Sequence, residues 1–314
     1  MKLVCSKSNL LKSVNIVLKA IPGKTTMPIL ECILIDASTN NIKFTANDME
    51  LGIETIVEGI IEERGIIALD AKIFSEIVRR LPDNYVTIET DDNLLTTITC
   101  EKAKFNIPGK SGEDFSYLPI IERNDCITIS QFTLKEVIRQ TIFSIAANEN
   151  NKLMTGELFE IKNNTLKVVS LDGHRIAIRK IELNETYEDK KVVVPGKTLN
   201  EISKILSGET NDKVNIFFTE NHIMFEFDQT TVVSRLIDGE YFRIDQMLSS
   251  DYETKVQINK REFLSCIDRA TLLVKEGDKK PIIINIEDNS MQLRIDSSMG
   301  SMKEDIDISK EGKD

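Results

Sequence analysis

An internal repeat with a period of 124 residues constrains the fold of this chain more than any other feature. Asp48 and Asp172 occupy equivalent predicted turns at that spacing, and apolar positions before them recur without a gap. Because a fixed period identifies a chain built from copies of one structural unit, we expect one fold to be used repeatedly. The matched pairs are Leu10 with Leu134, Val14 with Ile138, Leu18 with Ile142, Ile29 with Leu153, Leu30 with Met154, Leu34 with Leu158, Ile35 with Phe159, Ile42 with Leu166 and Phe44 with Val168.

Each full copy is predicted to contain two units of a strand, a helix and several strands. In the first copy, residues 2–6 alternate like a strand, and residues 8–21 carry apolar side chains at helical spacing with Ser8 as the N-cap. A second helix is predicted over 71–81. Its buried positions are predicted to be Ile73, Ile77, Val78 and Leu81. The other strands are predicted at 29–36, 41–45, 52–58, 85–89, 94–100 and 102–107.

The copies predict three domains, 1–122, 123–248 and 249–314. The third copy starts with a strand near Lys255, and the sequence ends at Asp314 after about half a unit, so we expect the third domain to be incomplete. Helices on one side of antiparallel sheets form an α+β arrangement. We therefore expect tandem α+β repeats in a curved array, with all the helices on one face.

A tight turn is predicted at Asp172-Gly173, between the alternating strands 165–169 and 176–181. Three interpretations of this stretch remain open. Asp172 and His174 could form an acid–base dyad of a hydrolase, although the sequence offers no adjacent nucleophile. Alternatively, Asp172 bonds its own backbone in the turn, and His174 and Arg175 are half-buried polar side chains. In the third interpretation the turn is the rim of a partner-binding site.

The composition describes a protein of the cytoplasm. No stretch approaches the roughly 18 apolar residues of a membrane helix, and the N-terminus leads directly into a strand pattern, so we expect no signal peptide and no membrane partner. The five cysteines are widely spaced and include no Cys-x-x-Cys, which favours reduced, mostly buried thiols. The two histidines are far apart in the sequence, which argues against a zinc site, so we expect no metal.

The charge is divided between elements. A net charge of −11 taken alone argues against nucleic acid. The five predicted helices, however, sum to +8, and the remainder of the chain sums to −19. One interpretation is that Lys and Arg are simply good helix formers on a solvated face. The other is that the helices line a surface that meets phosphates while the outside repels them, which would hold a duplex without reading its sequence.

Several stretches resemble the bacterial sliding clamps, the β subunits of DNA polymerase III. The resemblance runs through the whole chain in order, and Asp-Gly-His-Arg is its most specific part. The stretches that carry it are Thr26–Leu30, Thr155–Glu160, Leu171–Ala177, Val193–Lys197 and Ser234–Tyr241. It implies a clamp fold with antiparallel sheets outside and basic helices inside. It also implies a head-to-tail dimer that closes into a ring around duplex DNA and confers processivity on the polymerase, with no active site and no cofactor.

The resemblance also implies the partners and the residues that meet them. The implied partners are duplex DNA, the polymerase III alpha subunit, clamp-loader subunits and other proteins with clamp-binding motifs. The implied peptide pocket contains Met154, Leu171, Gly173, His174, Arg175, Ile176, Phe242 and Met247. The implied DNA-facing residues are Lys24, Arg79, Asn148 and Lys197. At the implied dimer interface, Phe105 and Ile107 face Leu272 and Leu273 of the second subunit.

The chain departs from the family pattern at three places. The family usually has Pro-Asp-Tyr where this chain has Phe242-Arg243-Ile244, and Thr where it has Leu171. The family also has a further half-repeat, with a C-terminal tail that closes the pocket, beyond the position of Asp314. These departures keep a second clamp hypothesis open, in which a paralogue or truncated clamp binds partners without encircling DNA.

Overall fold

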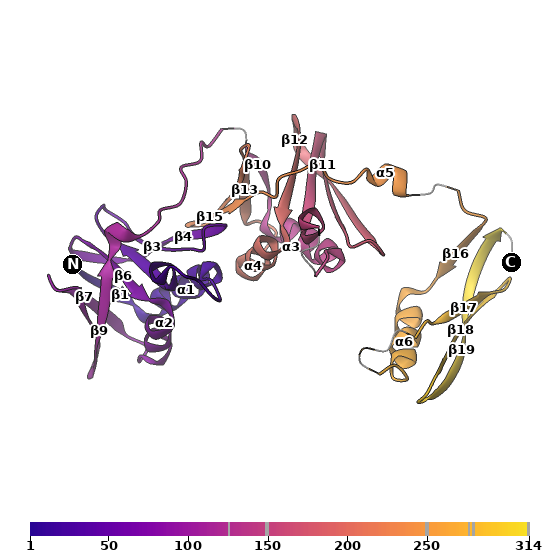
Figure 1. Ribbon diagram of the computed structural model, residues 1–314, viewed down its shortest axis with the longest axis horizontal. Helices are drawn as coiled ribbons and strands as arrows, with labels where there is room; N and C mark the ends of the chain where they lie inside the picture. Colours follow the sequence, from indigo (N-terminus) through magenta and orange to yellow (C-terminus); the bar gives the residue numbers. More distant parts are fainter. Residues whose placement is uncertain (125, 148–150, 249–250, 276, 278–279, 313–314) are drawn as a thin grey trace. The chain divides into compact units, whose positions relative to one another are not determined.

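The structure, a computed structural model, describes residues 1–314 except 125, 148–150, 249–250, 276, 278–279 and 313–314. The chain forms two compact units, Met1–Tyr241 and Phe242–Asp314 (Figure 1). The first two predicted copies fall almost entirely within the first unit. The division lies shortly before residue 249, where the third copy is predicted to begin.

The first copy contains alternating helical and strand segments, as predicted. Its elements are β1 (Lys2–Ser6), α1 (Lys7–Val17), the 3-10 helices η1 (Leu18–Ala20) and η2 (Pro28–Glu31), β2 (Cys32–Asp36), β3 (Ile42–Asn47), β4 (Leu51–Val57), β5 (Gly59–Glu63), β6 (Ile66–Asp70), α2 (Ala71–Arg80), β7 (Tyr85–Thr90), β8 (Leu95–Cys100), β9 (Ala103–Ser111) and the 3-10 helix η3 (Gly112–Asp114). Helices α1 and α2 pack against each other and against the strands.

The second copy repeats the first at the predicted period. Its elements are β10 (Ile127–Ser130), α3 (Gln131–Thr141), the 3-10 helices η4 (Ile142–Ser144) and η5 (Lys152–Thr155), β11 (Gly156–Leu171), β12 (Ile176–Pro195), α4 (Gly196–Ile205), β13 (Lys213–Phe218), β14 (His222–Phe227) and β15 (Thr230–Arg235). Helices α1 and α3 have bounds 124 residues apart, and so do η1 with η4 and η2 with η5. The caps match as well, because Ser6 accepts from Asn9 N and Ser130 accepts from Thr133 N.

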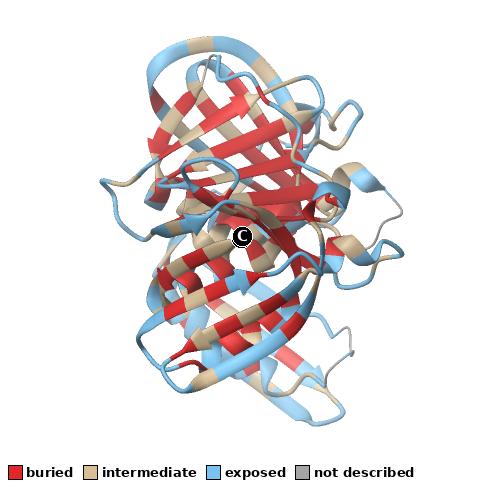
Figure 2. Cartoon of the chain, turned by 90° about the vertical axis from the view of Figure 1, so that its left-hand side faces the viewer, coloured by how far each residue is buried: buried red, intermediate tan, exposed pale blue. Residues whose placement is uncertain are grey.

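One sheet joins the two copies. Its strand order is β10-β13-β14-β15-β4-β3-β2-β6-β9-β8-β7-β1-β5, and the described strands pair antiparallel throughout. The copies meet where β15 pairs with β4, from Thr230 opposite Thr55 to Ser234 opposite Leu51. A single cluster of buried apolar residues contains side chains from both copies. Figure 2 shows these buried residues concentrated along the strands, with exposed residues on the loops.

Three local predictions were wrong. Ser6, rather than Ser8, caps α1. Residues 29–31 belong to η2 rather than to a strand, because Pro28 at its first position favours a helical start. Ile73 is 50% exposed, whereas Phe74 is buried and packs edge-on against Phe44 with ring centroids 6.0 Å apart. The larger aromatic side chain thus sets which face of α2 is buried.

The second unit has the same kind of architecture on a smaller scale. Its elements are α5 (Ile244–Met247), β16 (Thr254–Ile258), α6 (Lys260–Thr271), β17 (Ile283–Ile286), β18 (Ser290–Ser297) and β19 (Gly300–Gly312). The sheet order is β16-β19-β18-β17. Cys266 of α6 packs with Met291, Leu293, Ile306 and Ile308 of the sheet. Within the residues described, neither unit has a helix long and apolar enough to cross a membrane.

Candidate functional site

The turn between β11 and β12 is held by Asp172. Its Oδ1 accepts hydrogen bonds from the backbone N–H groups of His174 (3.1 Å) and Arg175 (3.2 Å), and its Oδ2 accepts from Nε of Arg175 at 3.0 Å. The bond from the His174 backbone, followed by those from Arg175, holds the pKa of Asp172 below its ordinary value. Gly173 has φ +87°, a conformation that favours glycine.

This geometry agrees with the interpretation in which Asp172 bonds its own backbone, and it does not agree with an acid–base dyad of Asp172 and His174. The carboxylate oxygens of Asp172 are occupied by backbone N–H groups and by a guanidinium, and the bond from His174 comes from its backbone rather than its imidazole. His174 is exposed. Among the residues that the structure describes, no cluster of three or more His, Cys, Asp or Glu side chains could hold a metal ion.

The turn of the first copy uses the same design. Asp48 Oδ1 accepts from the backbone N–H groups of Glu50 (3.0 Å) and Leu51 (2.6 Å), as Asp172 does 124 residues later. Asp48 also forms an ion pair with Lys197 of the second copy. The Asp48 side chain is 4% exposed and that of Lys197 is 58% exposed, so the carboxylate is a fixed anchor for the Lys197 ammonium group.

The residues of the predicted peptide pocket divide between the two units. Leu171 and Ile176 are paired across the β11–β12 hairpin, with Gly173, His174 and Arg175 between them. Met154 lies on η5, which packs against β11. The structure therefore brings Leu171, Gly173, His174, Arg175 and Ile176 together at the turn of the hairpin, and it places Met154 on the 3-10 helix that packs against β11. Phe242, half-buried, and Met247, exposed, belong to the second unit.

Phe143 is a neighbour of this hairpin that sequence reasoning missed. The Arg175 guanidinium lies 5.6 Å from the centroid of the Phe143 ring, a cation–π distance. Because Asp172 also binds that guanidinium, Arg175 is fixed by two groups. Phe143 lies on η4, 32 positions before Arg175 in the sequence, so no local pattern could have paired them.

The predicted DNA-facing residues lie on or beside helices. Lys24 is exposed in the segment between η1 and η2, Arg79 is in the last turn of α2, and Lys197 is in the first turn of α4. Asn148 lies outside the described residues. Lys197 pairs with Asp48, as described above, and Arg79 pairs with Glu76 of its own helix.

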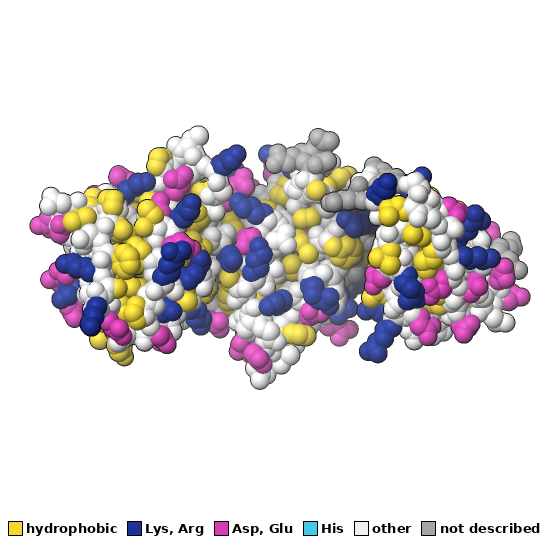
Figure 3. Space-filling model, turned by 90° about the horizontal axis from the view of Figure 1, so that it is seen from below, with side chains coloured by type: hydrophobic (Ala, Val, Ile, Leu, Met, Phe, Trp, Pro, Cys, Tyr) yellow, Lys and Arg dark blue, Asp and Glu magenta, His cyan; other side chains and the backbone are white. Residues whose placement is uncertain are grey.

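The helices carry less free positive charge than their sequences suggest. Four of their cations form pairs with a carboxylate one turn earlier on the same helix. Arg79 and Arg80 both pair with Glu76, Arg139 pairs with Glu136, and Lys204 pairs with Glu201. Helix α1 contains Lys7 and Lys12 and no acid. Figure 3 shows Lys and Arg side chains spread over one face, with Asp and Glu among them.

The predicted dimer-interface residues differ in exposure. Phe105 and Ile107 lie on β9, where Phe105 is 38% exposed and Ile107 packs into the core. Leu272 and Leu273 follow α6 in the second unit, with Leu272 exposed and Leu273 half-buried. Phe105 and Leu272 therefore offer more apolar surface than their neighbours do.

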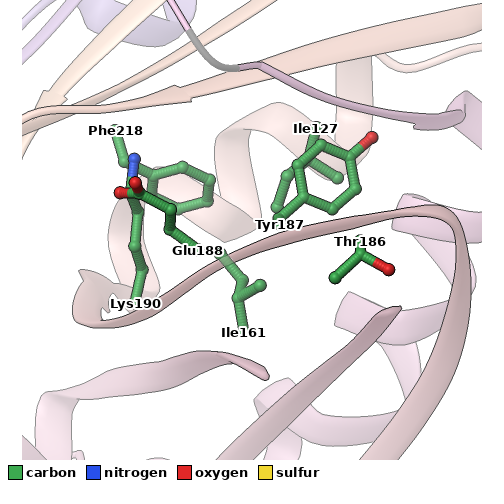
Figure 4. A pocket seen from close by; sticks show the side chains of 7 residues that line it. All are labelled: Ile127, Ile161, Thr186, Tyr187, Glu188, Lys190 and Phe218. Atoms are coloured by element: carbon green, nitrogen blue, oxygen red, sulfur yellow. The ribbon is translucent and has the colours of Figure 1, made fainter. Parts of the chain in front are cut away.

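A separate cavity of about 170 Å³ opens beside β10 and β12 (Figure 4). In the first copy, β1 pairs with β5 and β7, whereas β10 pairs with β13 alone among the described strands. The cavity lies at that less covered position. Its lining residues are Ile127, Ile161, Thr186, Tyr187, Glu188, Lys190 and Phe218. None of them belongs to the predicted sites.

Comparisons with known proteins place the chain among replication proteins. The profile of the DNA polymerase III beta subunit N-terminal domain matches residues 1–119, and that of its central domain matches 128–242. The beta sliding clamp of Staphylococcus aureus (strain Mu50) is 33% identical over 316 aligned positions, covering 98% of this chain and 84% of the relative.

Solved structures give the same result. A putative DNA polymerase III beta subunit from Eubacterium rectale is 74% identical with a TM-score of 0.98, covering 100% of this chain and 86% of that chain. The DNA polymerase sliding clamp of Bacillus subtilis is 35% identical with a TM-score of 0.96, covering 100% of this chain and 85% of that chain.

Proposed function

Because the chain belongs to the DNA polymerase III beta subunit family, whose members include the beta sliding clamps, we propose that it confers processivity on a replicative polymerase by encircling duplex DNA as a head-to-tail ring dimer. The observation that carries the proposal is the division of charge within a repeated clamp fold. The five segments predicted as helices from the sequence sum to +8, while the rest of the chain sums to −19. A surface of this kind attracts phosphates through the helices alone.

The protein acts without a catalytic site of its own, in the cytoplasm, as an accessory subunit. The β11–β12 hairpin supports a partner-binding role because it presents an apolar base, Leu171 and Ile176, beside a fixed cation, Arg175. Short peptides with Leu or Phe anchors and an acidic group suit such a site. The partners are the polymerase alpha subunit, clamp-loader subunits and other proteins that carry clamp-binding motifs.

The first test is topological. The protein is loaded by a clamp loader of a related bacterium onto nicked circular plasmid and passed through a sizing column in high salt, before and after the plasmid is linearised. A ring stays on the circle, because a topological link survives salt, and it leaves the linear form. Loss from both forms contradicts encirclement and favours the alternative of an open clamp relative that binds partners only.

The second test concerns the helix cations. Replacing Lys24 and Lys197 with Ala removes two phosphate contacts, so the slope of log affinity against log salt for linear duplex should fall by about 2. Lys213→Ala, an exposed cation on β13, is the matched control and should leave the slope unchanged. Equal changes in both variants would contradict a helix-lined DNA surface.

A further inference from the structure

Four buried positions change character between the two copies. In the first copy they are apolar members of the core and at most 1% exposed. In the second copy they are polar and 0% exposed. The pairs, each 124 residues apart, are Val17 with Thr141, Ala20 with Ser144, Ile33 with Glu157, and Ala46 with Ser170. We call the four polar residues the buried polar cluster.

The hydroxyl hydrogens of the cluster are largely committed to carbonyl groups. Ser170 Oγ donates to the Thr141 carbonyl at 2.6 Å, and Thr141 Oγ1 donates to the Val137 carbonyl at 2.8 Å. Both carboxyl oxygens of Glu157, and Ser144 Oγ, have no hydrogen-bond partner among the described residues. Thr141 has a single hydroxyl hydrogen, and the Val137 carbonyl already accepts it. The Thr141 oxygen can therefore only accept a hydrogen bond from the neighbouring Glu157 and cannot donate one to it.

An ionised Glu157 carboxylate would be a buried charge that receives no hydrogen bond, whereas a protonated carboxyl group can itself donate a hydrogen bond. We propose that Glu157 is protonated in the folded chain, and that the buried polar cluster is a proton-linked device that lowers the stability of the second copy as pH rises. The equivalent Ile33 gives the first copy no such dependence.

The surroundings of Glu157 agree with this assignment. Burial raises the pKa of Glu157 to about 8. The groups facing it are neutral: Thr141 from α3 and Tyr241, while β12 pairs with it through the backbone of Val194. Burial and then the Glu157 charge raise the pKa of Tyr241, so its phenol stays neutral over the relevant range.

The sign of the effect follows from linkage. Below about pH 4.5 the acid is protonated in both the folded and the unfolded chain, so it contributes no pH dependence. Between that pH and about 8 the unfolded chain alone releases the proton, which favours unfolding. The unfolding constant should therefore increase about two-hundredfold between pH 4 and pH 7 through this group, and level off above pH 8.

Urea unfolding between pH 5 and pH 9, followed by circular dichroism, tests the proposal on the full chain. Glu157→Gln keeps the shape and removes the titration, and Glu157→Ile reproduces the first copy. The exposed Glu209→Gln is the matched control. We expect the ratio of unfolding constants, wild type over Glu157→Gln, to rise by two to three orders of magnitude across this range. Parallel pH profiles of these two proteins would overturn the proposal.

A direct measurement covers the case in which the variants do not fold. In wild-type protein labelled with carbon-13 at the glutamate carboxyl groups, one resonance should titrate near pH 8, well above the others. If every glutamate resonance completes its titration below pH 6, Glu157 is ionised in the folded chain and the proposal fails.

Discussion

A pair of buried threonines at the β4–β15 junction gives a sharp test of how the two copies are joined. Thr55 and Thr230 are 3% and 5% exposed, and their hydroxyl oxygens lie 2.9 Å apart. Thr55 Oγ1 also lies 3.4 Å from the Gln229 carbonyl, which can accept its hydrogen. With Thr55 donating there, Thr230 donates to Thr55, so the two residues are not equivalent.

Thr55→Val leaves the Thr230 hydroxyl buried without an acceptor, which should cost about 1–3 kcal/mol of unfolding free energy. Thr230→Val leaves Thr55 bonded to Gln229 and should cost about 0.5–1 kcal/mol. The double variant removes both hydroxyls and should cost less than Thr55→Val alone, because replacing both partners by apolar groups of the same shape is nearly neutral.

Urea unfolding monitored by circular dichroism measures the three variants against wild type. The matched control is the Thr90–Thr96 hydroxyl pair, also buried and 2.9 Å apart, which lies within the first copy. Thr96→Val should lower the unfolding free energy of the first copy only. Thr55→Val should also broaden the urea unfolding transition, because the two copies would no longer unfold together. Equal costs for Thr55→Val and Thr230→Val, or a double variant that costs their sum, would refute the reasoning.

Two further predictions concern single side chains. Cys126 is half-buried while the other four cysteines are buried, and burial raises the pKa of Cys5 to about 12. A maleimide at pH 8 should therefore modify Cys126 first, as measured by mass spectrometry of labelled peptides with Cys126→Ser as the control. Labelling of Cys5 at the same rate would contradict this prediction. The Asn259 side chain caps α6 by accepting a hydrogen bond from the backbone N–H of Arg261 at 2.9 Å. Asn259→Ala should therefore lower the unfolding free energy of the second unit by about 1 kcal/mol, as measured by urea unfolding. An unchanged unfolding midpoint would show that the cap is not needed.

The architecture could be predicted because the repeat carries information that single segments lack. Ile42 and Leu166, or Phe44 and Val168, are ambiguous alone, but their common spacing identified equivalent strands, and all four are buried. Errors arose where a choice between adjacent residues depends on tertiary packing. Helix α2 buries Phe74, which packs against Phe44 of a distant strand, and leaves Ile73 half exposed.

Only those features of the candidate site that depend on residues adjacent in the sequence could be predicted. The Asp-Gly turn follows from residues next to one another, and Asp172 bonds its own backbone as one of the three interpretations expected. The Asp48–Lys197 pair and the Arg175 contact with Phe143 join distant segments, so no periodicity reveals them. The family resemblance suggested which residues matter, but it could not show which of their charges are already paired.

The ladder between β4 and β15 also determines how a mechanical load passes between the copies. Main-chain hydrogen bonds connect the two strands from Thr230 opposite Thr55 to Ser234 opposite Leu51. A slip of one residue would turn every side chain of β15 to the opposite face. A pull on one copy is thus carried into the other through backbone hydrogen bonds, while the side chains that face the core keep the two strands in register.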